Sequence, residues 1–372
     1  MRRLFLIGTA LAVAAGVVAS VSRAETQNEI NFGVISTESS TNLKTIWEPY
    51  LDAMAKGTGL KINAYYASDY AGVIEAMRFN KVQVARFGNK SAMEAVNRSN
   101  AELFALAVDV DGAPGYWSHL IVHKDSPLQN VDDVLKCDKS LDFGIGDPNS
   151  TSGFLVPTSY VFAPRNIDPK TCFKIVRNAS HEANGMAVAH KQVDVATIND
   201  KILRRLEVTS PDARKNIRVI WTSPLITNDP VVWRKDLAAD IKTRLYTWHM
   251  SYGRIGSPEE IAAARRILAA MLRAPFIPTN DDQLLPIRIM EASKDIMRIQ
   301  ADDKLSAGEK AAKIVPLQAA IKKEQDLTDK AEHSDFKKQV EAFLEADKAG
   351  DQAKLKAMIA TFAANAVNAP TN

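Results

Sequence analysis

Short apolar runs alternate with amphipathic stretches along most of the chain. Runs rich in β-branched and aromatic residues occupy 29–35, 61–66 and 82–87, and apolar positions at helical spacing occupy 42–55 and 70–77. Strands that alternate with helices in this way are typical of α/β units, in which helices cover a largely parallel sheet. The pattern therefore predicts an α/β fold.

The same alternation restarts further along the chain. Strands are predicted at 141–145, 173–176 and 193–197, with one helix after Gly153 and another over 184–191. A second series of strands and helices needs a core of its own, so it predicts a second domain.

Two later strand-like segments, 218–221 and 231–233, return the chain towards its first half. We expect domain 1 to comprise residues 25–118 and 229–300, and domain 2 to comprise residues 119–228. Because the chain then crosses between the domains twice, a ligand cleft is expected between them.

The composition changes over 301–372, where Lys, Glu, Ala and Asp surround periodic Ile, Leu and Val, interrupted by Pro316. This pattern predicts a C-terminal helical extension made of several exposed helices. Two roles stay open for these helices: a homodimer interface or a solvated cover.

Residues 1–24 have the pattern of a cleavable signal peptide. Arg2 and Arg3 precede an apolar run over 4–21, and small residues lead up to Ala24. An uncleaved membrane anchor is the competing interpretation, because the apolar run has nearly the length of a bilayer span.

Charge argues against a polyanionic partner. The chain has a formal net charge of +3, and the predicted signal peptide carries three basic residues and no acid, so the mature protein is about neutral. It also lacks a run of Lys and Arg, and we expect no nucleic-acid partner.

The two cysteines precede predicted strands: Cys137 lies before 141–145 and Cys172 before 173–176. If these strands are parallel neighbours, the cysteines lie side by side, which favours a disulfide in an oxidising compartment; two unpaired core thiols are the alternative. Two isolated cysteines do not form a zinc site.

Three consecutive hydroxyl residues, Ser150, Thr151 and Ser152, follow the predicted strand 141–145 and open the next helix. The first N–H groups of a helix lack intrahelical partners and lie at the positive end of its dipole, so such a turn can hold an oxyanion. Ordinary N-capping by one hydroxyl is the alternative.

His181 follows the predicted strand 173–176, so in a parallel sheet it lies at the same edge as the three hydroxyl residues. An imidazole N–H can donate to a phosphoryl oxygen. The two segments together predict a site for a phosphoryl-type anion.

The remaining motifs point away from catalysis. Of the other histidines, His119 and His123 lie on a strand-like segment without acidic partners, and the remaining three, His190, His249 and His333, lie on predicted helices. We therefore expect neither a metal nor a cofactor. The signatures G-x-S-x-G, G-x-x-x-x-G-K-[ST] and H-E-x-x-H are absent. A triad of Ser150, His181 and Asp229 can still be drawn, so a phosphoester or phosphonate hydrolase with His181 as base is the alternative to a site that only binds the anion.

Longer runs over about 30–290 resemble the periplasmic phosphonate-binding proteins of ABC transporters, within the phosphate, phosphite and phosphonate solute-binding group. The runs include Asp69-Tyr-Ala-Gly72, Met77-Arg-Phe-Asn-Lys81, Pro114-Gly-Tyr-Trp-Ser118 and Gly146 to Val156. The resemblance implies a two-domain type II periplasmic binding protein fold that closes on a phosphonate and delivers it to a membrane permease. It implies no catalysed reaction.

The resemblance also implies roles for individual residues. The phosphonate oxygens would be held by Ser150, Thr151, Ser152 and His181. The amino end of 2-aminoethylphosphonate would be held by two tyrosines and two acids, of which three match: Tyr70, Tyr116 and Asp229.

The fourth position departs from the family, because Lys201 stands where an acid is expected. Either Asp200 turns inward in its place, or Lys201 points to solvent, or an inward Lys201 favours phosphite or a carboxylated phosphonate. Arg86 is a second departure, at a position where the family tends to have Trp. It either covers the sheet edge or adds a cation to the cleft.

Overall fold

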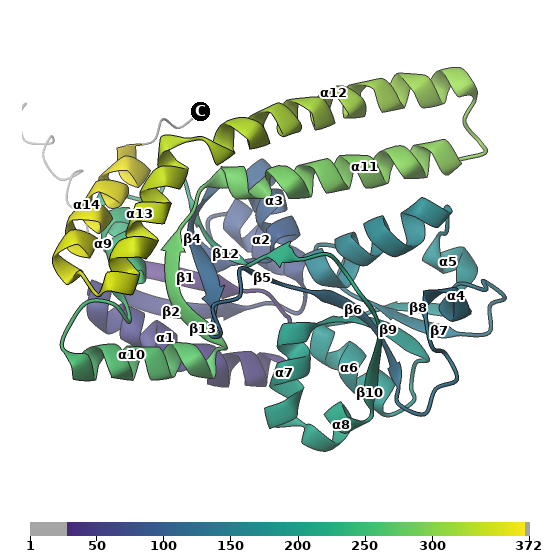
Figure 1. The fold of residues 1–372 in the computed structure, drawn as a ribbon, viewed down its shortest axis with the longest axis horizontal. Coiled ribbons are helices and arrows are strands. Elements are labelled where there is room, and N and C mark those ends of the chain that lie inside the picture. Colours follow the sequence, from purple (N-terminus) through teal and green to yellow (C-terminus); the bar gives the residue numbers. More distant parts are fainter. Residues whose placement is uncertain (1–27, 369–372) are drawn as a thin grey trace, which may run out of the picture.

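A computed structural model describes residues 28–368. Two sheets form two lobes, each covered by helices (Figure 1). The chain passes between the lobes through β5 (Gly115–Tyr116) and β11 (Ile226–Thr227), which pair with each other in an antiparallel ribbon. The predicted α/β fold is confirmed. The predicted signal peptide, 1–24, lies outside the described residues.

The first lobe contains a six-stranded mixed sheet. Strand β1 pairs in parallel with β2 and β3, whereas β12 runs antiparallel between β3 and β4, and β13 is antiparallel to β4. In spatial order the strands are β13 (Arg273–Pro278), β4 (Ala101–Asp109), β12 (Pro230–Arg234), β3 (Val84–Arg86), β1 (Glu29–Val34) and β2 (Lys61–Tyr66).

The second lobe contains a five-stranded mixed sheet. Strand β7 is parallel to β8 and β9, and β6 is antiparallel to β9 and β10. In spatial order the strands are β10 (Ile217–Thr222), β6 (Ser118–His123), β9 (Val195–Asn199), β7 (Asp142–Ile145) and β8 (Ile175–Asn178).

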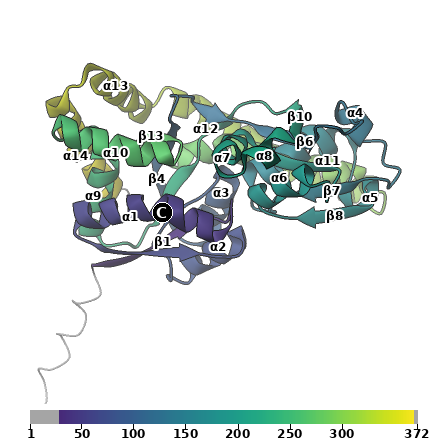
Figure 2. The same cartoon turned by 90° about the horizontal axis from the view of Figure 1, so that it is seen from below.

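Helices connect and cover both sheets, and Figure 2 shows the two lobes side by side. Within residues 28–368, no helix combines the length and hydropathy of a membrane-spanning segment. The first lobe has α1 (Ser40–Thr58), α2 (Tyr70–Arg78), α3 (Asn89–Arg98), α9 (Ala239–Ser251) and α10 (Pro258–Ala270). The second has α4 (Val131–Val134), η1 (Thr151–Leu155), η2 (Thr158–Phe162), η3 (Ala163–Arg165), α5 (Pro169–Cys172), α6 (His181–Ala189), α7 (Asp200–Thr209) and α8 (Pro211–Lys215).

Local capping explains why helices begin directly after strands. Asp69 accepts from the N–H of Gly72 at the start of α2, and Ser180 caps α6 in the same way. Asn199 ends β9 and caps α7 by accepting from the N–H of Ile202. Asp, Ser and Asn are favoured N-caps because their side-chain oxygens satisfy free helix N–H groups.

Two predicted strands were placed two residues too early. The prediction 193–197 corresponds to β9 (Val195–Asn199), and the other case is β8. For β8 the prediction was 173–176, but the strand begins at Ile175. Phe173 is buried before the strand, where its ring stacks on Phe143 at 4.5 Å. The apolar character of this segment therefore reflects core packing of the connection between α5 and β8 as well as the strand.

Cys137 and Cys172 form a disulfide whose Cα atoms are 4.0 Å apart. The bond links the loop before β7 to the end of α5, just before β8. These two strands are parallel neighbours, as the pairing of the cysteines requires. The bond therefore ties together the two strands whose far ends lead to Ser150 and His181.

The chain continues through η4 (Asp281–Leu284) and α11 (Leu285–Ala301) into the C-terminal extension, which contains α12 (Ala307–Glu332), α13 (Asp335–Ala349) and α14 (Gln352–Asn368). Figure 1 shows α11 and α12 as an antiparallel pair along one side of both lobes. The predicted interruption at Pro316 was wrong, because α12 runs through it. Strong helix formers and packing on α11 outweigh the hydrogen bond that proline removes.

The last two helices cover the first lobe. Phe343, Leu355 and Phe362 are buried in the same cluster as Tyr246 of α9. In contrast, α12 buries none of its residues. Part of the extension is therefore a cover that has its own apolar contacts, and the homodimer stays a prediction.

Candidate functional site

The turn after β7 holds the three predicted hydroxyl residues at the start of a helical segment. Ser150 caps this segment, and its Oγ accepts from the N–H of Gly153 at 2.9 Å. Ser150, Thr151 and Ser152 are each only 2% exposed. Their hydroxyls are thus removed from bulk water at a point where helix N–H groups are also free.

Glycines make this tight turn possible. The N–H of Gly146 donates to the carbonyl of Gly153 at 2.9 Å. A Cβ atom on Gly146 would lie 2.6 Å from the Cα of Gly153, closer than side chains are found in proteins. The backbone therefore folds onto itself here and presents the hydroxyls to the cleft.

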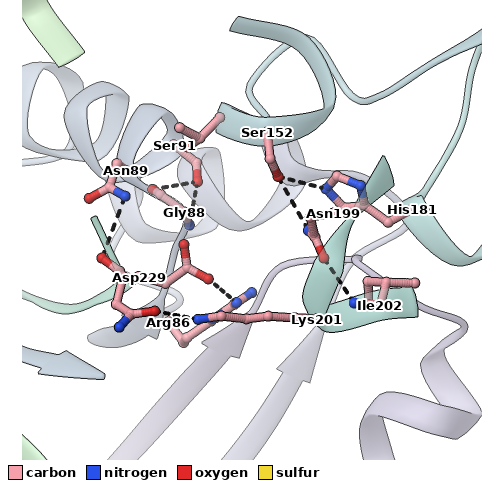
Figure 3. A network of polar contacts seen from close by, with 12 residues as sticks. Arg86, Gly88, Asn89, Ser91, Ser152, His181, Asn199, Lys201, Ile202 and Asp229 are labelled. Carbon is pink, nitrogen blue, oxygen red and sulfur yellow. Dashed lines mark hydrogen bonds and ion pairs between the residues drawn. The ribbon is translucent and has the colours of Figure 1, made fainter. Parts of the chain in front are cut away.

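His181 is the first residue of α6 and is brought to the same place by the neighbouring strand β8. Its Nε2 lies 3.3 Å from Ser150 Oγ and 3.4 Å from Ser152 Oγ, and Figure 3 shows the contact with Ser152. Its Nδ1 has no hydrogen-bond partner among the described residues. Burial lowers the pKa of His181 to about 4. At neutral pH the ring is therefore uncharged and carries one N–H donor.

We call Ser150, Thr151, Ser152 and His181 the cradle. It faces the first lobe, because Thr151 Oγ1 accepts from the N–H of Lys90 at the start of α3 at 2.9 Å. On the other side, Asn199 Nδ2 donates to Ser152 Oγ at 3.2 Å (Figure 3). The cradle therefore lies between the lobes, as the sequence predicted.

The two predicted tyrosines also lie at this cleft. Tyr70 begins α2, where its backbone N–H donates to Asp147 Oδ2 of the other lobe at 3.1 Å. Tyr116 lies on β5, in the connection between the lobes. Both are 3% exposed, and burial raises the pKa of both hydroxyls, so they stay neutral donors.

Asp229, which precedes β12, is 4% exposed and forms an ion pair with Arg86 of β3 (Figure 3). Burial acts to raise the pKa of Asp229, but Arg86, Lys201 and Arg273 together hold it below its usual value. The carboxylate is therefore charged and already neutralised. Arg86 does not merely cover the sheet edge, because its guanidinium lies in the cleft.

Lys201 points into the cleft. Its Nζ donates to Asn228 Oδ1 and lies 4.7 Å from the centre of the Tyr116 ring, an arrangement that favours a cation. Burial lowers the pKa of Lys201 to about 8. Asp200 does not replace it, because its carboxylate accepts from the N–H of Trp117. Of the alternatives that the sequence left open, the structure has the inward lysine.

A cavity next to the cradle collects these charges. Its lining includes Asn199, which donates to Ser152 of the cradle. Six charged residues also line it: Glu38, Arg86, Lys201, Arg205, Asp229 and Arg273. Sequence reasoning missed Glu38, Arg205 and Arg273, which come from three separate segments. Nothing in their local pattern indicates a site, since each resembles an ordinary surface charge.

The arrangement does not assemble a hydrolytic triad. Ser150 Oγ is near His181 Nε2, but Asp229 is paired with Arg86 instead of with His181. A triad needs the acid to bind and orient the imidazole. Among residues 28–368 there is also no cluster of three or more His, Cys, Asp or Glu side chains that could hold a metal.

Comparisons with known proteins identify the family. Residues 32–284 match the family model described as "ABC transporter, phosphonate, periplasmic substrate-binding protein". The Phosphonates-binding periplasmic protein of Escherichia coli K12 is 50% identical over 297 residues, which cover 80% of this chain and 86% of that protein.

Solved structures extend the match. The binding component of an ABC phosphonate transporter from Pseudomonas aeruginosa is 49% identical, with a TM-score of 0.78 over 81% of this chain and 97% of that one. PhnD1 of Prochlorococcus marinus with methylphosphonate shares the fold, at 19% identity and a TM-score of 0.63 over 72% of this chain and 99% of that one. The chain therefore belongs to the phosphonate-binding periplasmic proteins of ABC transporters and has their type II fold.

Proposed function

We propose that this protein binds an organophosphonate in the periplasm and delivers it to the permease subunits of an ABC importer. The observation that carries the proposal is the cradle. Four buried donors, all neutral at pH 7, come together from the ends of β7 and β8, and Thr151 contacts the start of α3 across the cleft.

The cradle suits a phosphonyl group because its oxygens are strong acceptors. Hydrogen bonds to an ionised acceptor are shorter and stronger than neutral ones. The starts of η1, α6 and α3 add the favourable end of the helix dipole, although the N–H groups of Lys90 and Glu182 are already bonded to Thr151 Oγ1 and to the carbonyl of Thr37. Neutral donors also cost less to bury than cations when no anion is bound.

Delivery requires a closed form that a membrane subunit can distinguish from an open one. Several polar contacts cross the cleft in this structure: Glu182 Oε2 of α6 accepts from the N–H of Ser39 at 2.7 Å, and Arg204 pairs with Asp109 at 3.0 Å. A phosphonate held between the lobes would stabilise these contacts, and closure would then report occupancy.

The proposal covers the phosphonate class, within which 2-aminoethylphosphonate is the first compound to test. The resemblance of the sequence assigns Tyr70, Tyr116 and Asp229 to its amino end. Phosphite is the alternative for which the phosphonyl contacts alone would suffice. A hydrolase remains the alternative from another class.

The test is calorimetric titration of protein that has been unfolded and refolded to remove bound ligand. Methylphosphonate, 2-aminoethylphosphonate, phosphite and phosphate are compared, and we expect one-to-one binding of at least one phosphonate more tightly than phosphate. Absence of binding by all phosphonates would overturn the proposal. Release of inorganic phosphate from these ligands or from a chromogenic phosphate ester would favour the hydrolase instead.

A further inference from the structure

The cavity beside the cradle carries an excess of positive charge. Four of the residues that line it are cations and two are carboxylates. Arg205 lies 3.8 Å from Glu38, and Arg86 pairs with Asp229. Among the described residues, this leaves Lys201 and Arg273 without a carboxylate partner.

Burial shields Arg273 from bulk water almost fully and Lys201 in part. Arg273 is 7% exposed, and Lys201 is partly buried beneath the contacts that it makes with Asn228 and Tyr116. Burial lowers the pKa of Arg273 to about 10. Cations in such a place are unfavourable unless an anion joins them, so the cavity has the electrostatic character of an anion site.

Arg86 supplies a free donor to the same place. One of its terminal nitrogens pairs with Asp229, while its Nε is buried without a hydrogen-bond partner among the described residues. A buried donor without a partner costs free energy until an acceptor arrives. Guanidinium groups bind carboxylates well because their N–H donors match the two oxygens.

An ammonium group fits this cavity poorly. One oxygen of Asp229, Oδ1, has no hydrogen-bond partner and could accept from it. However, three cations, Arg86, Lys201 and Arg273, already surround this carboxylate. Their combined repulsion of an added ammonium group would exceed its attraction to the single carboxylate.

We propose that the natural ligand is a phosphonate with a second, carboxylate group, and that Arg86 and Lys201 bind this carboxylate while the cradle holds the phosphonyl group. The inference rests on the proposed function and specifies its ligand class. The phosphonyl end is common to every candidate ligand, whereas the cationic cavity selects among them.

A matched ligand series tests the inference. Propylphosphonate, 2-aminoethylphosphonate and 3-phosphonopropionate share the phosphonyl group and a two-carbon spacer but end in a neutral, a cationic and an anionic group. In titrations of the refolded protein at pH 7, 3-phosphonopropionate should bind at least tenfold more tightly than propylphosphonate, and the amine more weakly than both. Equal affinities, or tightest binding of the amine, would overturn the inference.

Substitutions of Lys201 test whether this residue recognises the carboxylate of the ligand. Lys201→Gln should reduce the affinity for 3-phosphonopropionate at least tenfold more than the affinity for methylphosphonate, and Lys201→Glu should make the amine the preferred ligand. Lys215→Gln removes a lysine that is 74% exposed in the same lobe and should change neither affinity. Circular dichroism and thermal unfolding check that each variant folds. An unchanged preference in folded Lys201→Glu would contradict the role of Lys201.

The outcomes separate this inference from the proposed function. If no phosphonate binds, methylphosphonate included, both fail. If methylphosphonate binds but the carboxylate adds no affinity, the protein is a phosphonate-binding protein and only the inference about the second anionic group fails.

Discussion

The cradle and the cationic cavity lie side by side but are built in different ways. The cradle consists of neutral donors from two neighbouring strand ends of one lobe. The cationic cavity draws Arg86 from β3, Lys201 from α7 and Arg273 from β13, so both lobes contribute. The cradle, which would bind the phosphonyl group shared by all candidate ligands, is built within one lobe. The cationic cavity, which would bind the end in which the ligands differ, is assembled from both lobes.

The two parts differ in how easily a single substitution changes what they bind. A turn that combines backbone N–H groups, glycines and hydroxyls changes only if its geometry changes. A cavity lined by long charged side chains changes its preference with a single substitution, because each unit of charge is felt strongly where water is excluded. One family can therefore keep its phosphonyl site while its members differ in the rest of the ligand.

The largest expected effect is on the free energy of unfolding, and it comes from the ion pair in the cationic cavity. Asp229→Asn should lower the free energy of unfolding by about 3 kcal/mol or more, because it leaves the buried Arg86 without its counter-charge. Urea unfolding measures the change. The control is Asp240→Asn, which breaks an exposed pair with Arg244 and should cost less than about 1 kcal/mol. Similar losses in the two variants would mean that the Arg86 pair is not a buried charge pair in solution.

A cradle variant should weaken all ligands alike. Ser152→Ala removes a donor to the phosphonyl group, and a hydrogen bond to a charged group contributes roughly 1.5–3 kcal/mol, so affinities should fall about 10-fold to 100-fold. Titration with the matched ligand series should show the same order of affinities as before. The control Ser140→Ala changes an exposed serine of the same lobe. A loss confined to one ligand would contradict the division between the two parts.

The pH dependence should affect only the cationic cavity. Because burial lowers the pKa of Lys201 to about 8, the free protein loses this charge above pH 8, and a carboxylate must then bind together with a proton. The affinity for 3-phosphonopropionate relative to methylphosphonate should therefore fall about tenfold between pH 7 and pH 9.

Using the ratio of the two affinities cancels the titration of the phosphonyl group itself. The same ratio in Lys201→Gln should be independent of pH, which is the control. The groups that act on the charge of Lys201 or contact it are Asp229, Arg273, Arg86, Asp109, Asn228 and Tyr116. A constant ratio in the unmodified protein would show that Lys201 does not bind the carboxylate.

The smallest expected effect concerns closure. Glu182→Ala removes two contacts across the cleft, from the N–H of Ser39 at 2.7 Å and from Asn42 Nδ2 at 2.5 Å. Because each of these two partly exposed hydrogen bonds contributes about 0.5 kcal/mol, together about 1 kcal/mol, all affinities should fall about fivefold without a change in order. The control is Glu207→Ala, at an exposed position of α7. A change in ligand order would mean that Glu182 takes part in selection.

Much of the cradle could be predicted because three of its four residues are consecutive in the sequence. A strand followed by a glycine-rich turn, an N-cap and consecutive hydroxyls specifies the local geometry of Ser150 to Ser152, and the same rule places His181 at the next strand end. The prediction of strand bounds failed where an apolar residue belongs to the core and not to a strand, since Phe173 packs on Phe143 before β8 begins. The predicted interruption at Pro316 failed for another reason: the other residues of α12 favour a helix strongly enough to continue through the proline.

The sequence by itself determined the α/β pattern, the hydroxyl turn, and which residue types stand at Arg86, Lys201 and Asp229. Only the tertiary structure decided that Lys201 points inward, that Arg86 neutralises Asp229, and that Arg273 joins them. The physical reason is the distance along the chain between the residues that interact. Caps and turns depend on bonds within a few residues, whereas the direction of a long charged side chain depends on the charges and cavities that distant segments bring next to it.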